Sequence, residues 1–406
     1  MLFHVATRLR PYSTSARLAA AIAAGGFLLS LLAPGARAAE APPLVEFVFT
    51  SDVHFGITRG YFRGGANVDA KTVNEALVET INRLPGAVLP DDHQLKAGQP
   101  VGPIDFVAIT GDIANRQELY PVHIQSAAAS WKQFETVYID GLTLKDRAGS
   151  PTQLLIVPGN HDVSDAIGAP SKMLPATDAT SLTEMYNRMM HPAKPLTPDT
   201  YNFATDKINY SRNFGGVHAV FLTMWPDTIE RAWMEKDLKN VSASTPVFIF
   251  CHDQPDLDTR HLTNPNGNHS INRTDNFENV VSDICADGPT ADAPTTIEQR
   301  ALVAFLKAHK NIVAYFHGHS NWTEYYTWKG PDDDIALNVF RSDSPMKGKT
   351  GAKDETKLAF EIVIVDAAAQ KMTVRECLWD KHKRENPVSA PVDWGISTTV
   401  SIAPRQ

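Results

Sequence analysis

The sequence predicts an α/β fold, because apolar strand-like runs alternate along the chain with segments of helical periodicity. The central run is 106–115, FVAITGDIAN, which is typical of a buried strand that ends at a glycine and delivers Asp112. Four further apolar runs also end in Asp, Asn or His. Open α/β sheets place their ligand sites beyond the carboxyl ends of strands, so these runs indicate both the fold and the position of a site.

The five runs end in side chains that can bind a metal ion. They span 44–54, 106–115, 153–162, 246–252 and 311–321. Their terminal polar residues are Asp52 and His54, then Asp112, then Asn160, His161 and Asp162, then His252, and finally His317, His319 and Asn321. A capping aspartate or a buried histidine explains any one run by itself. Because the ends of neighbouring strands converge, the five together predict a mixed nitrogen and oxygen metal site.

Helices and hairpins complete the predicted chain. Apolar spacing predicts helices over 70–84, about 123–137, 229–238 and 296–309. Hairpins are predicted over 210–223, turning at Gly215 and Gly216, and over 357–365 with 371–378. Loops or irregular segments are predicted over 55–69, 85–103, 163–200 and 253–295. Since neither an internal repeat nor a linker is visible, residues 39–406 are interpreted as one domain with a C-terminal hairpin and tail.

The N-terminal segment has the features of a secretory signal peptide. Arg8, Arg10 and Arg17 accompany a small and apolar stretch over 18–32, and the Ala-Arg-Ala sequence at 36–38 fits a cleavage site. An uncleaved anchor is the alternative, but the apolar stretch is short for a bilayer span. We therefore expect a signal peptide over 1–38, no stable membrane insertion of the mature chain, and a periplasmic or secreted location.

Charge and cysteine content narrow the function classes. The formal net charge of −8 over 406 residues, with no run rich in Lys or Arg, argues against a nucleic acid polymer as partner.

The three cysteines, Cys251, Cys285 and Cys377, do not have the spacing of a zinc motif. Cys251 is expected to be a buried apolar residue. A bond between Cys285 and Cys377 is left open, and no bond is favoured.

The order of the motifs resembles that of the calcineurin-like metallophosphoesterase superfamily of binuclear metal phosphoesterases. The matching residues are Asp52 and His54 (Asp-x-His), Gly111 and Asp112 (Gly-Asp), 159–162 (Gly-Asn-His-Asp), the lone strand-end His252, and Gly318 and His319 (Gly-His). The resemblance implies a central β-sandwich of two mixed sheets flanked by helices. It also implies that 39–406 is one catalytic domain of a metal-dependent phosphoric ester hydrolase.

The resemblance implies a role for each matching residue. Two divalent or mixed-valence ions, with Mn, Fe or Zn as candidates, are expected as cofactors. Asp52 and His54 would bind the first ion, Asn160, His252 and His319 the second, and Asp112 both, because a carboxylate has two oxygens to offset two cations. A hydroxide between the metals is the expected nucleophile. His161 is the candidate acid for the leaving alkoxide. Asp162 is assigned either to orient His161 or to cap a loop.

The final motif departs from the superfamily pattern. Where relatives have Gly-His-x-His, this chain has Gly318, His319, Ser320 and Asn321, so an amide oxygen replaces an imidazole at the first metal. Asn321 is the expected ligand, directly or through water. His317 is the alternative if the strand extends that far and its side chain lies on the same side.

The predicted function is hydrolysis of a small phosphomonoester or phosphodiester by an exported binuclear enzyme. The alternative is a degenerate relative that binds phosphate or a phosphorylated ligand without turnover. The motifs do not distinguish a monoester from a diester, and the sequence does not define the oligomeric state. Four aromatic residues follow the last motif and either stack on a substrate base or lipid or pack a strand: Trp322, Tyr325, Tyr326 and Trp328.

Overall fold

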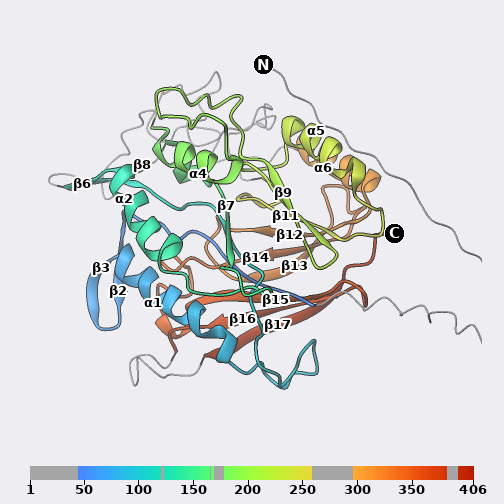
Figure 1. Cartoon of the computed structure of the whole chain (residues 1–406), viewed down its shortest axis with the longest axis horizontal. Coiled ribbons are helices and arrows are strands. Elements are labelled where there is room, and N and C mark those ends of the chain that lie inside the picture. Colours follow the sequence, from blue (N-terminus) through green and yellow to red (C-terminus); the bar gives the residue numbers. More distant parts are fainter. Residues whose placement is uncertain (1–43, 120–122, 165, 169–177, 258–295, 382–391) are drawn as a thin grey trace, which may run out of the picture. The chain divides into compact units, whose positions relative to one another are not determined.

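Two six-stranded mixed sheets, which face each other, organise the chain in the computed structural model (Figure 1). The structure describes residues 44–119, 123–164, 166–168, 178–257, 296–381 and 392–406. The first sheet has the order β17 (Asp393–Ser401), β16 (Lys371–Leu378), β15 (Ala359–Asp366), β1 (Val45–Thr50), β4 (Phe106–Thr110), β7 (Gln153–Val157). The second has the order β13 (Glu324–Trp328), β14 (Leu337–Arg341), β12 (Ile312–His317), β11 (Val247–Phe250), β10 (Val217–Phe221), β9 (Tyr210–Phe214). The predicted sandwich of mixed sheets is confirmed.

Phenylalanine side chains join the two sheets. The Phe47 ring of β1 lies 5.8 Å from the Phe250 ring of β11 and 5.6 Å from the Phe316 ring of β12, measured between centroids. Phe106 of β4 stacks on Phe214 of β9 at 4.5 Å. Every residue of β1, β4, β11 and β12 is buried. This explains the continuous apolar runs, because one face of each sheet meets the other sheet and the opposite face is covered.

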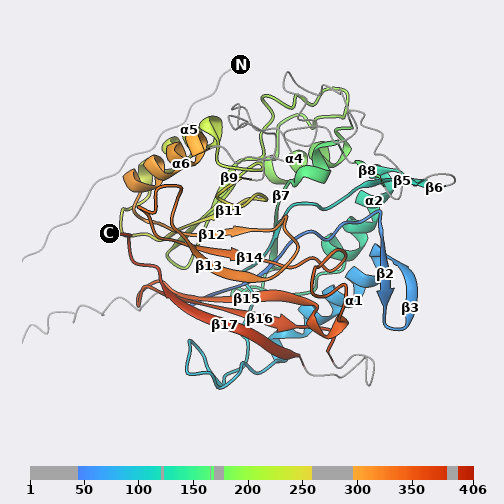
Figure 2. The ribbon, with the colours of Figure 1, turned by 180° about the vertical axis from the view of Figure 1, so that it is seen from behind.

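Helices flank both sheets (Figures 1 and 2). In both views α5 (Thr228–Asp237) and α6 (Thr296–Ala308) lie together beside the second sheet, while α1 (Ala70–Arg83) and α2 (Ala127–Phe134) lie beside the first. The other helical segments are η1 (Leu84–Gly86), η2 (Glu135–Ile139), α3 (Asn160–Ser164), α4 (Thr180–Met190), η3 (Leu238–Asn240) and η5 (Glu355–Lys357). Two small sheets contain β2 (Thr58–Phe62) with β3 (Gly65–Asp69), and β6 (His123–Gln125) with β5 (Arg116–Leu119) and β8 (Ala166–Gly168).

Most of the predicted elements are confirmed, including the hairpins β9–β10 and β15–β16 and the helices α1, α5 and α6. The predicted loop over 55–69 is wrong, because this segment forms the β2–β3 hairpin. Arg63 and Gly64 adopt φ of 49° and 90°, the positive values that a tight two-residue hairpin turn requires. An Arg-Gly pair is a weak sequence signal for such a turn, since the residues usual at its first position are Asn, Asp and Gly.

Three further segments differ from the prediction. The helix expected over about 123–137 begins only at Ala127, because Ser126 caps it by accepting the Ala129 N–H, and His123–Gln125 is a strand. The segment 163–200, expected to be irregular, contains α4, whose N-cap residue Ala179 has no side chain to cap the helix. The tail contains the edge strand β17, which has no fully buried residue, so its apolar pattern in the sequence is weak.

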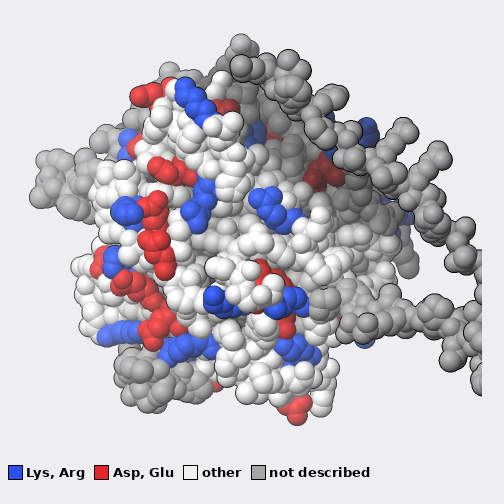
Figure 3. Space-filling view, viewed as in Figure 1, with Lys and Arg blue, Asp and Glu red and all other residues white. Residues whose placement is uncertain are grey.

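The structure also bears on the cysteines, the aromatic residues and the surface. Among the described residues, Cys251 and Cys377 are buried and carry no disulfide, whereas Cys285 lies outside the described part of the chain. Tyr325 packs on Phe340 at 5.6 Å and Trp328 is 8% exposed, which supports the packing role for both. On the face shown in Figure 3, acidic and basic side chains are interspersed.

The described helices include none that has the length and apolarity needed to cross a bilayer. Residues Ala41–Gln406 cluster as one compact unit. The predicted signal peptide over 1–38 and most of the predicted loop 253–295 lie outside the described residues, so export stays a prediction.

Candidate metal centre

The carboxyl ends of parallel strands from both sheets meet at one place. The Asp52 N–H, after β1, donates to the Gly111 carbonyl, after β4, at 3.0 Å, and the Gly318 N–H donates to the His252 carbonyl at 3.1 Å. A Cβ atom at Gly318 would lie 1.8 Å from the Ser51 hydroxyl oxygen, so only glycine lets the second sheet approach the first this closely. The five predicted runs therefore deliver their polar ends to a common site.

The backbone of this site is strained in a consistent way. Five of the predicted ligands adopt positive φ: Asp52 (55°), His54 (45°), Asp112 (52°), His319 (66°) and Asn321 (59°). Residues other than glycine rarely occupy this region, and each such conformation costs on the order of 1 kcal/mol or more. Strained residues of this kind gather at functional sites, because the strain is retained where it aims a side chain.

Asp112 lies between side chains from the two sheets. Its Oδ2 is 3.4 Å from His54 Nε2, which follows β1 of the first sheet. Its Oδ1 is 3.5 Å from His252 Nε2, which follows β11 of the second sheet, and accepts the His161 N–H at 2.9 Å. Burial acts to raise the pKa of Asp112, but His252, His161 and His54 outweigh it and lower the pKa well below its usual range. The carboxylate is therefore anionic, and each oxygen faces a different histidine.

His252 is oriented as a metal ligand. Its Nδ1 lies 2.6 Å from the Thr110 carbonyl oxygen, which can only accept, so this nitrogen carries a proton. Nε2 then points to the Asn160 amide oxygen at 3.0 Å and towards Asp112. Burial acts to lower the pKa of His252, but Asp112, Asp52 and Asp253 raise it to about 9. Divalent cations would neutralise the negative charge that these three carboxylates bring together.

Asp52 and His54, the predicted ligands of the first metal ion, are also held in place by neighbouring groups. Asp52 is fully buried and its Oδ2 accepts the His319 N–H at 2.9 Å, which links the ends of β1 and β12. Burial raises the pKa of Asp52 to about 6. Its Oδ1 lies 3.8 Å from His54 Nε2. The His54 ring is held on its other side, where Nδ1 is 3.2 Å from the Asn115 amide nitrogen.

Buried polar atoms without hydrogen bonds show that this donor set fits metal ions. Asp52 Oδ1, His54 Nε2 and Asn321 Oδ1 have no hydrogen-bond partner among the described residues. Buried polar atoms are nearly always satisfied, so the pair Asp52 Oδ1 and His54 Nε2, which lie 3.8 Å apart, indicates that a ligand supplies the missing interaction. Carboxylate, imidazole and amide donors without thiolate are a ligand set that suits divalent metal ions. The choice among Mn, Fe and Zn stays a prediction.

Among the described residues, two groups of His, Asp, Glu or Cys side chains have ligand atoms that lie within 4.8 Å of one another. The first group, Asp52, Asp112 and His252, contains members of both predicted ligand sets, as expected where Asp112 lies between two ions. The second group is His252, Asp253 and His319. Asp253 was not predicted. Its position directly after the strand-end histidine was the available sequence signal, although it also begins a long polar segment and so resembled a loop residue.

Asp162 fixes the two loops that carry the site. It is completely buried, and its carboxylate accepts hydrogen bonds of 2.8–3.1 Å from the N–H groups of Ile113, Ala114 and Gly159. Burial, with the neighbouring Asp112, raises the pKa of Asp162 to about 7. Of the two roles expected for Asp162, these contacts support loop capping, because they join the turn after β4 to the turn after β7.

His161 lies at the edge of the site beside an unpredicted cation. Its side chain is 17% exposed, its Nε2 is 4.0 Å from Asp112 Oδ2, and its ring is 5.3 Å from the His54 ring. The Lys347 ammonium lies 3.2 Å from the same Nε2. Lys347 follows the last motif by more than twenty residues, in a segment without a recognisable pattern, so sequence reasoning gave no signal for it.

The structure separates the two candidates in the final motif. The strand β12 extends to His317, but the His317 Nε2 lies 3.3 Å from the Tyr326 hydroxyl oxygen and its Nδ1 3.0 Å from the Gly318 carbonyl oxygen. Asn321 donates through its amide nitrogen to the His319 carbonyl at 2.7 Å, which leaves its amide oxygen buried without a hydrogen bond. His317 is thus directed to Tyr326 of β13, whereas the amide oxygen of Asn321 is left available to a ligand. The assignment of Asn321 to the first metal ion stays a prediction.

We expect Asn321→His to retain the first metal ion better than the parent chain during mild chelation. Imidazole is a stronger donor than an amide oxygen for first-row transition metals, so the rate of metal loss should fall, while Asn321→Ala should raise it. Metal content against time in a chelator, measured by mass spectrometry, checks this. His317→Ala is the matched control and should leave metal retention unchanged. Loss of one ion in that control would make His317 the ligand.

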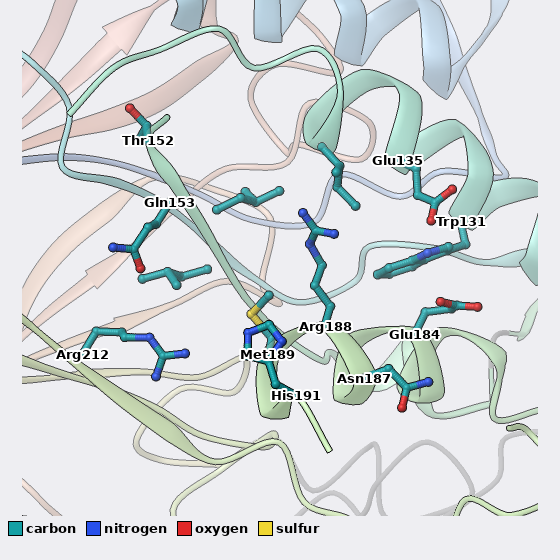
Figure 4. A pocket seen from close by; sticks show the side chains of 13 residues that line it. Trp131, Glu135, Thr152, Gln153, Glu184, Asn187, Arg188, Met189, His191 and Arg212 are labelled. Atoms are coloured by element: carbon teal, nitrogen blue, oxygen red, sulfur yellow. The ribbon is translucent and has the colours of Figure 1, made fainter. Parts of the chain in front are cut away.

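A separate cavity of about 610 Å³ lies between the edge strands of the two sheets and the helices α2 and α4. Figure 4 shows Arg188 of α4 extending into the space between Arg212 of β9 and Trp131 of α2. The residues that line this cavity include none of the predicted metal ligands. It is therefore a feature of the sandwich edge that is distinct from the metal centre.

The model of the calcineurin-like phosphoesterase family matches residues 45–323. This range contains every residue of the predicted ligand set. The chain belongs to the calcineurin-like phosphoesterase family. The side chains of Asp52, Asp112, His252 and His319, which lie within the matched range, belong to the groups of close ligand atoms in the structure.

Several solved structures of phosphoesterases are similar to this chain at low sequence identity. A dimetal phosphatase from Danio rerio has 12% identity and a TM-score of 0.46, and the match covers 88% of this chain and 99% of that chain. The calcineurin-like phosphoesterase YfkN from Bacillus subtilis has 10% identity and a TM-score of 0.32, covering 88% and 91%. A 5′-nucleotidase precursor from Thermus thermophilus has 9% identity and a TM-score of 0.35, covering 89% and 55%. The comparison with curated proteins gives no match.

Proposed function

We propose that this chain is a two-metal-dependent phosphoesterase that hydrolyses a small phosphoester. The observation that carries the proposal is the position of Asp112, whose two oxygens face His54 on one side and His252 on the other at 3.4 and 3.5 Å. A carboxylate placed in this way can serve two adjacent cations. When bound, the ions supply Lewis-acid activation of phosphate oxygens and of the attacking water.

The side chains of this protein divide into holding and proton-donating groups. Asp52 and His54 on one side of Asp112, and Asn160, His252 and His319 on the other, would hold the ions. The Thr110 carbonyl fixes the His252 ring, so its Nε2 stays directed at the centre. His161, at the partly exposed edge, is placed to donate a proton to the leaving alkoxide oxygen.

Metal-dependent hydrolysis by the purified chain tests the proposal. The chain is stripped of metal with a chelator, reloaded with manganese, and assayed with bis(4-nitrophenyl) phosphate and 4-nitrophenyl phosphate while the bound metal is counted. We expect two ions per chain and hydrolysis of at least one ester that disappears on stripping and returns on reloading. Tight phosphate binding without hydrolysis would instead support the degenerate, non-catalytic relative.

A further inference from the structure

The segment that contains Lys347 is fixed against the turn of the first metal motif. The Ser344 hydroxyl donates to the Asp52 carbonyl at 2.7 Å, and the Ser344 hydroxyl oxygen accepts the Lys347 N–H at 2.9 Å. Arg59, 2% exposed, donates through its guanidinium to the Pro345 carbonyl at 2.8 Å and to the Gly351 carbonyl. The Lys347 backbone is therefore tied to Asp52 on one side and to the β2–β3 hairpin on the other.

Packing within the segment restricts it further. Asp343 is 2% exposed, its carboxylate accepts the Ser344 N–H at 2.8 Å, and a Cβ atom at Gly348 would lie 2.5 Å from its Oδ1. The Gly348 N–H donates to the Ser344 carbonyl at 3.1 Å. Because the turn is closed on both sides of Lys347, its ammonium is pre-organised at the rim of the site rather than free to sample the surface.

The other basic side chains near the centre are engaged elsewhere. The Lys349 ammonium and the Arg341 guanidinium lie 3.3 and 3.6 Å from the centroid of the Trp322 ring. Arg59 binds main-chain carbonyls, as described above. Both cations therefore contact the half-buried Trp322 ring. Of the basic residues that the structure describes, Lys347 is the one whose side chain reaches the proton-donating edge, where its ammonium lies 3.2 Å from His161 Nε2.

We propose that Lys347 binds a non-bridging oxygen of the substrate phosphate and that the substrate is a phosphomonoester dianion. This inference rests on the proposed function and specifies its substrate class. An ammonium group only donates, and an anionic phosphate oxygen is a stronger acceptor for it than an imidazole nitrogen. Bound phosphate would therefore draw Lys347 from His161 and leave that histidine directed at the leaving oxygen beside it.

Charge explains why a fixed lysine favours a monoester. A phosphomonoester carries close to two negative charges at neutral pH and three non-bridging oxygens, whereas a diester carries one charge and two such oxygens. The attraction of a fixed cation scales with the charge of its partner, so the same ammonium stabilises the dianion about twice as strongly. Lys347 thus adds selectivity that the metal ligands alone do not provide.

Lys347→Gln tests the proposal in the metal-loaded full chain. We expect kcat/KM for 4-nitrophenyl phosphate to fall about 10- to 100-fold, the loss of one charge-assisted hydrogen bond. For bis(4-nitrophenyl) phosphate the fall should be only about 3- to 10-fold, since half the charge is involved. Lys347→Arg should recover part of the monoester activity. Lys353→Gln, which removes an exposed lysine from the same segment, is the matched control and should change neither value.

Calorimetric binding of inorganic phosphate at mildly alkaline pH provides a second readout that does not need turnover. Its affinity should fall about 10- to 100-fold in Lys347→Gln, with metal content and thermal midpoint unchanged. Equal losses for both esters, or an unchanged phosphate affinity, would overturn the assignment of Lys347. If the parent chain hydrolyses neither ester, the proposed enzymatic function fails, while the phosphate titration still decides whether Lys347 is an anion ligand.

Discussion

Asp112→Asn is expected to abolish phosphoester hydrolysis and to reduce the bound metal below two ions per chain. The carboxylate oxygens face His54 and His252 from opposite sides, and an amide offers one neutral oxygen in their place. Because Lewis-acid stabilisation of the transition state is worth several kcal/mol, the rate should fall about 10³-fold or more. Metal stoichiometry and kcat/KM, measured on the same preparation, check both parts.

The matched control for this variant is Asp105→Asn. Asp105 is also buried, but its carboxylate pairs with Arg147 and the Glu46 N–H at the opposite end of β4. That substitution should lower stability without changing the metal content of the folded protein. Full activity and two bound ions in Asp112→Asn would refute the two-metal centre, since no other described residue lies between the two histidines in this way.

His161→Ala is expected to retain both metal ions and to lose about 10²- to 10⁴-fold in rate on an alkyl phosphate. An alkoxide is a poor leaving group and needs a proton, whereas 4-nitrophenolate leaves readily without one. The loss should therefore be much smaller for 4-nitrophenyl phosphate. The partial exposure of the His161 side chain and the contact of its Nε2 with the Lys347 ammonium at 3.2 Å are the structural reasons to expect metal retention.

The control for this variant is His309→Ala, which removes a surface histidine that pairs with Glu235 on α5. It should leave both rates unchanged. Equal losses on the alkyl and nitrophenyl esters would show that His161 is not the proton donor. Loss of a metal ion from His161→Ala would instead make this histidine a ligand.

Local sequence patterns were sufficient to predict the strands that are buried along their whole length. The strands β1, β4, β11 and β12 are buried along their whole length, so their apolar runs could be identified and their polar ends predicted. The β2–β3 hairpin, α4 and β17 were missed or misplaced for a common reason. These elements are short, half-exposed or without a capping side chain, so their sequence patterns are weak. Tertiary contacts rather than local preference select their conformation.

The sequence by itself determined the fold class and the family, because hydrophobic runs and motif order are properties of the chain alone, and it predicted which strand-end residues lie at the candidate metal centre. Only the tertiary structure decided that His317 packs against Tyr326 while the Asn321 amide oxygen stays without a hydrogen bond. It also decided that Asp162 caps two loops and that Lys347 reaches His161. These contacts join residues far apart in sequence, and their distances depend on how the two sheets pack, which local periodicity does not encode.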